Sequence, residues 1–188
     1  MGQESHTAPF AKGIAAEMEL LHELEGEAYW KQLKAITERN EFKHVENGIY
    51  SAAGKKNPDF PNLLEASRKA VAQGYRVYIL PNPKGFKSAD LILERKGFYR
   101  MYDVKTISGK ASIDNRLFDS IGQSDRVIIL LNTNVNPRFL SEDIRKYFEY
   151  SEKAKEVIVF KGGKTIVVSR ATAFSNGFQA RFRKEFTK

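Results

Sequence analysis

Hydrophobic and polar residues repeat with two different periods along this chain, and the change divides it near residue 60. From Gly13 to Arg39 apolar residues recur every three to five positions, which predicts a helix that is broken or bent near Gly26. Residues 40–61 show neither period and contain two glycines and two prolines, so we expect a loop there.

From residue 62 onward short apolar runs alternate with helical segments. The apolar runs predict strands over residues 76–80, 89–95, 98–107 and 126–132, and a hairpin of 157–161 with 165–170 around Gly162-Gly163. Helices are predicted over 62–73, 115–123 and 141–153, with Asn62 and Ser141 as N-caps. The order α-β-β-β-α-β-α-β-β predicts an α/β fold in which helices flank a mixed β-sheet.

The two patterns predict an N-terminal helical and irregular segment over residues 1–57 and a second domain over 58–188. Near the C-terminus Phe174, Phe178, Phe182 and Phe186 follow one another at every fourth position, interleaved with basic residues. Aromatic and basic neighbours of this kind can stack on nucleic-acid bases. One helical stripe of phenylalanines is more often a helix packed on a core, and we expect that here.

Composition narrows the class of protein. A hydrophobic share of 41% is that of a globular chain, and no apolar run has the roughly 18 residues that a membrane-spanning helix needs. The absence of cysteine excludes disulfides, thiolate metal ligands and a cysteine nucleophile.

The net charge of +8 is distributed unevenly. Residues 1–60 hold 7 Lys/Arg and 10 Asp/Glu (net −3), so the remaining 24 Lys/Arg and 13 Asp/Glu leave residues 61–188 at +11. Such a basic segment favours a polyanionic partner, because binding to a phosphate backbone releases counterions. Solubility alone is the other explanation of the charge.

The predicted hairpin over residues 89–107 carries the candidate chemistry. With Lys96-Gly97 as the two central turn residues, Asp90 lies directly opposite Asp103, and strand alternation puts Lys105 on the same face. Like charges across a strand pair destabilise a sheet, and a divalent cation between them removes the repulsion. Such an ion lowers the pKa of a bound water, which Lys105 can orient for attack on a phosphate.

Two other interpretations of these residues are open. The hairpin face can be a solvated surface on which Lys105 offsets the two acids. Pro58-Asp59 and Glu94-Arg95-Lys96 also contain the same residue types, but Asp59 falls in the irregular segment and Lys96 in the proposed turn.

Asp90 followed by Asp103-Val104-Lys105 resembles the signature of the PD-(D/E)XK nucleases, and the predicted order over residues 62–132 resembles their αβββαβ, restriction-endonuclease-like core. The resemblance implies a site with Mg²⁺ or Mn²⁺ held by Asp90, Asp103 and Glu65, with Lys105 as a catalytic residue and Gln123 in support. Ala89 stands where the family name has proline, and Asp103 replaces the commoner glutamate.

The arrangement ADL…YDVKT…IGQSDRVIILL is similar to C-terminal nuclease toxins of contact-dependent inhibition and related polymorphic toxin systems. This resemblance implies cleavage of tRNA or DNA in the cytoplasm of a target cell, delivery within a larger secreted protein, and a cognate immunity protein as partner. It favours tRNA slightly over DNA.

Basic residues near the site in sequence are candidates for phosphate contacts: Lys84, Lys87, Lys110 and Arg116. Two non-enzymatic alternatives remain. A nucleic-acid-binding module with this fold would bind without divalent metal, and an interaction protein would use its basic face on an acidic partner.

Overall fold

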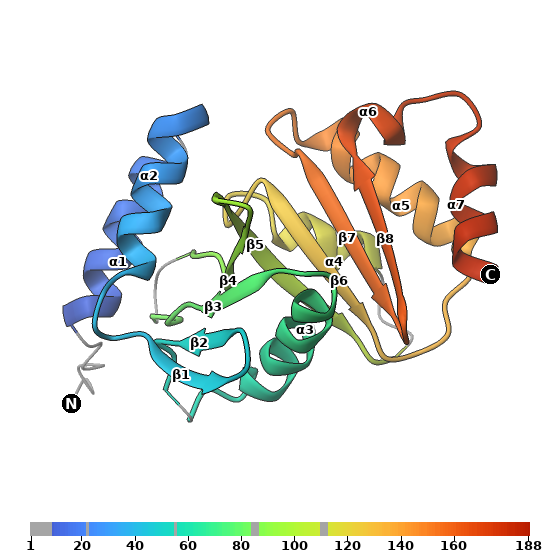
Figure 1. Cartoon of the computed structure of the whole chain (residues 1–188). Coiled ribbons are helices and arrows are strands. Elements are labelled where there is room, and N and C mark those ends of the chain that lie inside the picture. Colours follow the sequence, from blue (N-terminus) through green and yellow to red (C-terminus); the bar gives the residue numbers. More distant parts are fainter. Residues whose placement is uncertain (1–8, 22, 55, 84–86, 110–112) are drawn as a thin grey trace, which may run out of the picture. The chain divides into compact units, whose positions relative to one another are not determined.

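The computed structural model describes residues 9–21, 23–54, 56–83, 87–109 and 113–188 (Figure 1). The chain divides into two compact units, Met1–Met101 and Tyr102–Lys188, and the division falls inside strand β5 (Phe98–Ile107). The boundary expected between residues 57 and 58 therefore lies inside the first unit. Each unit combines helices with β-strands, as expected for an α/β protein.

Among its described residues the first unit has three helices and four strands before β5. Its elements are α1 (Pro9–Leu21), α2 (Gly26–Thr37), β1 (Lys43–Glu46), β2 (Ile49–Ser51), α3 (Phe60–Ala72), β3 (Arg76–Ile79) and β4 (Leu91–Arg95). The strands follow one another in the sheet in chain order. β2 pairs with β3 in parallel, while β1–β2 and β3–β4 are antiparallel.

The short β1–β2 hairpin replaces part of the loop expected over residues 40–61. β1 is exposed or half-buried along its whole length, so its side chains show no buried periodicity that a sequence pattern could reveal. Gly48 turns the chain with φ 77°, a conformation that favours glycine. Pairing with β3, which comes much later in the chain, holds β2 in place.

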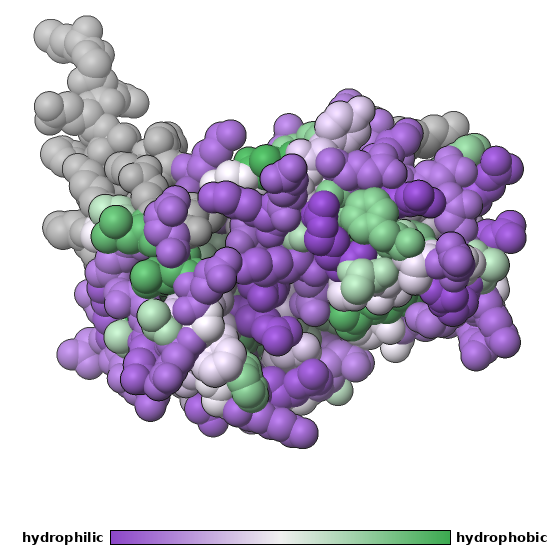
Figure 2. All heavy atoms as spheres, turned by 90° about the horizontal axis from the view of Figure 1, so that it is seen from above, coloured by the Kyte–Doolittle hydropathy of each residue, from purple (hydrophilic) through white to green (hydrophobic). Residues whose placement is uncertain are grey.

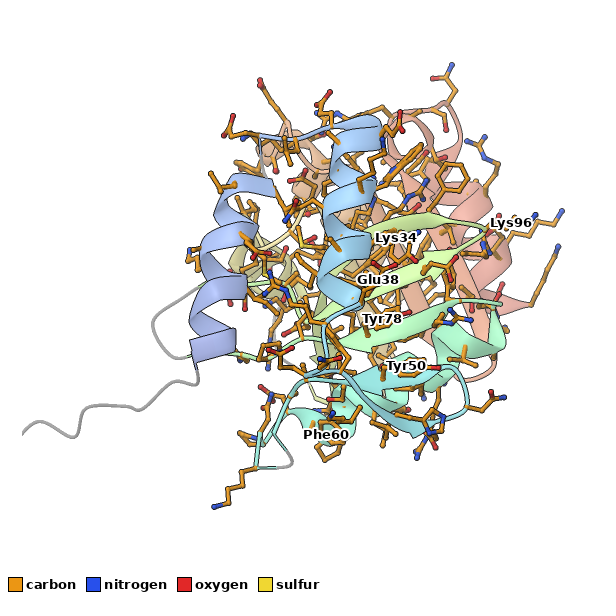
Figure 3. All side chains as sticks on the ribbon, turned by 60° about the vertical axis from the view of Figure 1, so that its left-hand side comes forward. Lys34, Glu38, Tyr50, Phe60, Tyr78 and Lys96 are labelled. Atoms are coloured by element: carbon orange, nitrogen blue, oxygen red, sulfur yellow. The ribbon has the colours of Figure 1, made fainter. Side chains whose placement is uncertain are left out.

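The N-terminal helices pack on the first unit's strands. The predicted break is confirmed, because α1 ends at Leu21 and α2 begins at Gly26. One core cluster unites both helices with the strand region: Ile14, Met18, Leu21, Leu33, Ile36, Tyr78, Leu80, Ala89, Ile92 and Met101. In Figure 3 α2, which carries Lys34 and is followed by Glu38, lies beside the strands that carry Tyr50 and Tyr78. The rings of Tyr50 and Tyr78 stack with their centroids 5.4 Å apart.

The second unit continues from β5 with the predicted order of elements. These are α4 (Ile113–Asp119), β6 (Arg126–Leu131), α5 (Pro137–Tyr150), β7 (Glu156–Lys161), β8 (Lys164–Ser169), α6 (Arg170–Ala173) and α7 (Phe178–Thr187). β5, β6 and β7 are parallel neighbours, and β7–β8 is the predicted antiparallel hairpin. From α3 to β6 the chain therefore has the expected αβββαβ order.

Two predicted N-caps are wrong. α3 begins after Asp59, so Asn62 lies inside its first turn. α5 is capped by Asn136, whose side chain accepts a hydrogen bond from the Arg138 amide at 2.9 Å. Pro137 then occupies the first helical position, where its missing amide hydrogen costs nothing. The Ser141 hydroxyl instead donates to the Arg138 carbonyl within the helix.

The C-terminal phenylalanines divide into core and surface. Phe178, Phe182 and Phe186 lie on α7 and are 4%, 2% and 2% exposed, which confirms the predicted packing for these three. Phe174 lies between α6 and α7 and is 42% exposed. The main core of the second unit combines α4, α5 and α7 with its strands.

Most of the molecular face in Figure 2 is hydrophilic, and hydrophobic side chains form small separate groups on it. None of the helices among the described residues is both long and apolar enough to cross a bilayer.

Candidate active site

Asp103 and Lys105 lie two residues apart on β5 and share one face of the second unit's sheet. β5 pairs in parallel with β6, which puts Asp103 beside Val127 and Lys105 beside Ile129. Ile107, the next residue on this face, belongs to the core cluster with Val127 and Ile129. Backbone pairing within a parallel sheet thus fixes the two polar side chains against an apolar core.

The two side chains form an ion pair at the margin of this core. Lys105 Nζ lies 3.0 Å from Asp103 Oδ2, and the two side chains are 15% and 1% exposed. A carboxylate so deeply buried is costly unless a cation or hydrogen bonds compensate it. Asp103 is therefore not a solvated surface residue, while Lys105 offsets its charge.

Tyr147 on α5 is a neighbour of this pair that the sequence analysis missed. Burial raises the pKa of its phenol to about 12; the nearby Ser120 hydroxyl lowers the pKa in part, and the charges of Asp125 and Asp103 raise it further. Its hydroxyl has no hydrogen bond of ordinary geometry within the described chain. The Ser120 hydroxyl donates to the Leu117 carbonyl at 2.6 Å. Tyr147 follows Leu140 and Ile144 along the buried stripe of α5, so its spacing indicates only a core position.

This pKa predicts a loss of stability in alkali. The phenol has a pKa of about 10 in the unfolded chain and about 12 in the folded one, so its contribution is complete below pH 10 and disappears as the pH rises toward 12. We expect the free energy of unfolding to fall by on the order of 2 kcal/mol more in wild type than in Tyr147→Phe over this range. Urea unfolding at several pH values measures the difference, and parallel curves would contradict it.

Gln123 follows α4, as expected, and its amide has a local partner. Gln123 Nε2 donates to the Asp119 carbonyl at 2.7 Å, and the side chain is half-buried. This bond stabilises the C-terminal end of α4, where the last carbonyls lack helical partners. A direct role at Asp103 stays a prediction.

The other two predicted metal ligands belong to the first unit. Asp90 immediately precedes β4 and is half-buried, and its carbonyl accepts a hydrogen bond from the Leu80 amide at 2.9 Å. Glu65 is half-buried on α3.

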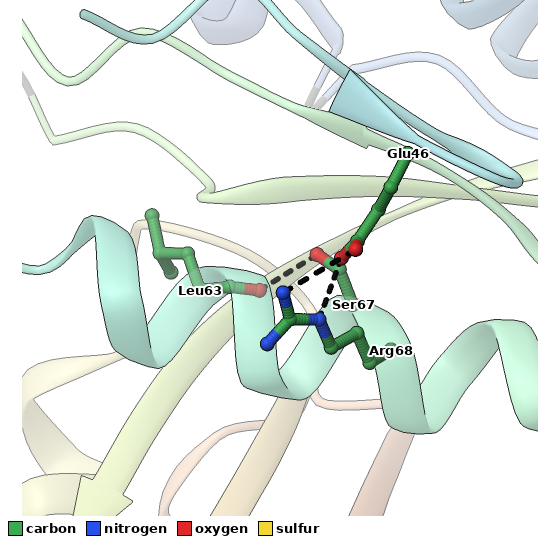
Figure 4. Close-up of polar contacts among 4 residues, drawn as sticks. All are labelled: Glu46, Leu63, Ser67 and Arg68. Atoms are coloured by element: carbon green, nitrogen blue, oxygen red, sulfur yellow. Dashed lines mark hydrogen bonds and ion pairs between the residues drawn. The ribbon is translucent and has the colours of Figure 1, made fainter. Parts of the chain in front are cut away.

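Arg68, on the same helix as Glu65, joins α3 to β1 of the first unit (Figure 4). The guanidinium of Arg68 binds the Glu46 carboxylate through Nε at 2.6 Å and Nη2 at 3.3 Å, and the Ser67 hydroxyl donates to the Leu63 carbonyl. The hydrogen bond with Glu46 raises the pKa of Arg68, and Glu65 adds to this through its charge.

The turn that the proposed register requires is present. Lys96 and Gly97 both have positive φ, 54° and 81°, as in a type I′ hairpin turn. The Glu94 carboxylate accepts a hydrogen bond from the Gly97 amide at 2.8 Å, so this competing acid stabilises the turn. The other competing acid, Asp59, is the residue that precedes α3.

Two of the four candidate phosphate-binding residues lie in the part of the chain that the structure describes. Lys87 is exposed in the first unit, and Arg116 is exposed on α4 in the second. Lys84 and Lys110 lie outside the described residues.

Of the predicted metal ligands, Asp90 and Glu65 belong to the first unit and Asp103 to the second. Within neither unit do the described residues place three His, Cys, Asp or Glu side chains close enough to hold an ion. The donor chemistry nevertheless suits Mg²⁺ or Mn²⁺, which prefer carboxylate oxygens, and the Asp103 carboxylate is buried on β5. Asp90, Asp103 and Glu65 thus stay the predicted ligands.

Comparisons with known proteins give a single kind of similarity. No protein-family model matches the sequence, and no curated protein matches it. The chain is similar to a solved structure described as a CdiA-CT/CdiI toxin and immunity complex from Burkholderia pseudomallei. The match has 18% sequence identity and a TM-score of 0.47, and it covers 64% of this chain and 98% of the other.

Proposed function

We propose that this chain is a metal-dependent nuclease that hydrolyses phosphodiester bonds in nucleic acid. The observation that carries the proposal is the buried pair of Asp103 and Lys105, whose charged atoms lie 3.0 Å apart on β5. The next residue on the same face, Ile107, belongs to the apolar core. A core gains little from an ion pair, since apolar residues of similar size are usually as stable there. Charged residues that are buried at such an energetic cost are candidates for catalysis or ligand binding.

Each residue has a distinct part in the proposed reaction. Asp103 supplies a fixed carboxylate, and Asp90 and Glu65 are the other residues that would hold the ion. Mg²⁺ or Mn²⁺, when bound, supplies charge neutralisation and a more acidic water. Lys105 orients the attacking water or neutralises charge that develops on the phosphate, and Gln123 supports the site.

The proposed substrate is tRNA or DNA. Residues 61–188, with a net charge of +11, supply the electrostatic attraction to a phosphate backbone. The sequence resemblance to polymorphic toxins adds the remaining parts of the proposal: delivery within a larger protein, action in the cytoplasm of a target cell, and inhibition by a cognate immunity protein.

A second candidate is a nucleic-acid-binding module without catalysis. It is favoured by the ion pair itself, because Lys105 compensates the charge of Asp103 inside one unit. Such a module would bind nucleic acid equally well with and without divalent ions.

The test is cleavage of plasmid DNA and of total tRNA by the purified chain, with Mg²⁺, with Mn²⁺ and with EDTA. We expect one substrate to be cut with metal and neither with EDTA. If the folded protein cuts neither substrate with either metal, the nuclease proposal is abandoned. Metal-independent binding without cutting would then identify the non-catalytic module.

A further inference from the structure

Phe174 is the exposed member of the C-terminal phenylalanine stripe, and it lies among arginines. The guanidinium carbons of Arg145 and Arg170 lie 5.9 and 5.3 Å from the centre of its ring. The ring is 42% exposed, whereas the other three phenylalanines of the stripe are buried. Packing explains those three but leaves Phe174 without a function in the core.

A pocket of about 380 Å³ opens beside this ring in the second unit. Its lining consists of Arg145, Phe174, Ser175, Asn176, Gly177, Phe178, Gln179, Ala180 and Arg183. These residues offer aromatic rings, hydroxyl and amide groups and two guanidiniums, and none of them is acidic. Aromatic, amide and guanidinium groups together match the base and the phosphate of a nucleotide.

Some of the arginines hold this surface in shape. Arg170 donates to the carbonyls of Ser151 at 2.8 Å and Ala154 at 3.5 Å. Arg181 donates to the Asn176 carbonyl at 2.6 Å and also binds the Ser175 hydroxyl. The segment that carries Phe174 is therefore anchored before any ligand arrives, which lowers the entropic cost of binding.

Other arginines remain available for a ligand. The guanidinium of Arg183 is exposed and has no hydrogen-bond or ion-pair partner within the described part of the chain. Arg145 is paired with Glu149 at 3.3 Å, with about half of each side chain exposed, so solvent screens this interaction strongly. Both can turn toward a phosphate at little cost.

We propose that this pocket binds one unpaired nucleotide of a nucleic acid, with its base stacked on Phe174 and its phosphate held by Arg145 and Arg183. The inference rests on the proposed function in one respect, namely that the ligand is nucleic acid. Within the second unit, none of the candidate active-site residues Asp103, Lys105 and Gln123 lines this pocket. It would select single-stranded segments or loops, in which a base is free to leave its stack.

A larger pocket in the same unit is unsuited to phosphate. It measures about 700 Å³, and its lining includes Asp114, Glu142 and Asp143 but only Lys146 as a cation. The pKa of Asp143 is raised, first by burial and then by the charge of Asp114, as expected where acids crowd together. A polyanion would be repelled there, so charge complementarity selects the smaller pocket.

The experiment measures binding of labelled single-stranded and double-stranded oligonucleotides by fluorescence anisotropy, in EDTA and at several salt concentrations. The parent protein carries Asp103→Asn so that no substrate is cut. Phe174→Leu removes the aromatic face but keeps an apolar side chain, and its control is Phe139→Leu, an exposed phenylalanine at the acidic pocket. Arg183→Gln is matched with Lys153→Gln, an exposed cation after α5.

We expect Phe174→Leu to weaken single-strand binding by roughly tenfold and duplex binding much less. Arg183→Gln should weaken binding and lower the salt dependence by about one phosphate contact, while both controls bind like the parent. If Phe174→Leu binds single strands as tightly as the parent protein, the inference is wrong. It is also wrong if the parent protein binds no oligonucleotide. Cleavage by the wild-type protein is measured separately. If binding depends on Phe174 but the wild type cuts no substrate, the nuclease proposal fails and the inference about this pocket still holds.

Discussion

Replacing Asp103 with asparagine is expected to lower the cleavage rate by at least about a hundredfold in a protein that remains folded. Asparagine has the size and shape of aspartate but lacks the charge that a metal ligand needs. Lys105, which is 15% exposed, can extend its ammonium toward water when the carboxylate charge is lost, so the fold should tolerate the change. The measurement is initial cleavage rate with Mg²⁺ or Mn²⁺, beside a thermal unfolding curve for each protein.

Lys105→Met should lose a comparable share of activity, since it keeps the length of the side chain and removes only the cation. Two matched controls carry the same chemical changes at exposed positions of the same unit, namely Asp119→Asn and Lys153→Met. Cleavage by Asp103→Asn and Lys105→Met within a few-fold of the controls would place the reaction elsewhere.

The double variant separates catalysis from structure. Lys105→Met alone removes the cation paired with a carboxylate that is 1% exposed, which should destabilise the fold. Adding Asp103→Asn removes the buried charge and should restore part of that stability. A double variant that regains stability but not cleavage indicates a catalytic role, because a purely structural pair would recover both together.

The local pattern of hydrophobic and polar residues was sufficient to predict the order of the helices and strands from α3 to β8. Buried strands such as β6 are continuous apolar runs, and Lys96-Gly97 forms the turn that its short polar sequence predicted. The β1–β2 hairpin was missed because β1 buries no regular set of side chains and is held by pairing with β2. The α5 cap was missed although Asn136-Pro137 carried a local signal, since Ser141 also precedes an apolar stripe.

The candidate site was predictable only where a single strand determines it. Alternation along β5 places Asp103 and Lys105 on one face, and the structure brings their charges within 3.0 Å. The burial of Asp103 could not be predicted, because it depends on the helices and strands of the second unit that pack around this face. Gln123 was predicted by resemblance alone, and its observed partner is the carbonyl of its own helix region.

The largest expected effect on stability is that of Phe182→Ala on α7. The Phe182 ring is 2% exposed and lies between those of Phe178 and Phe186, with centroid distances of 5.8 and 5.9 Å. Truncation removes this contact area and leaves a cavity that a packed core fills only in part, which costs about 3–5 kcal/mol of unfolding free energy. Since a folded protein has only about 5–15 kcal/mol in total, the second unit should become markedly easier to unfold.

Phe174→Ala is the matched control, because the same residue type is truncated two stripe positions earlier. Phe174 is 42% exposed, so its loss should cost about 1 kcal/mol, mostly through its contacts with the arginines. Urea unfolding followed by circular dichroism measures both variants. Equal losses would mean that α7 contributes no more to the core than the exposed segment before it, and that the stripe does not separate into a packing part and a binding part.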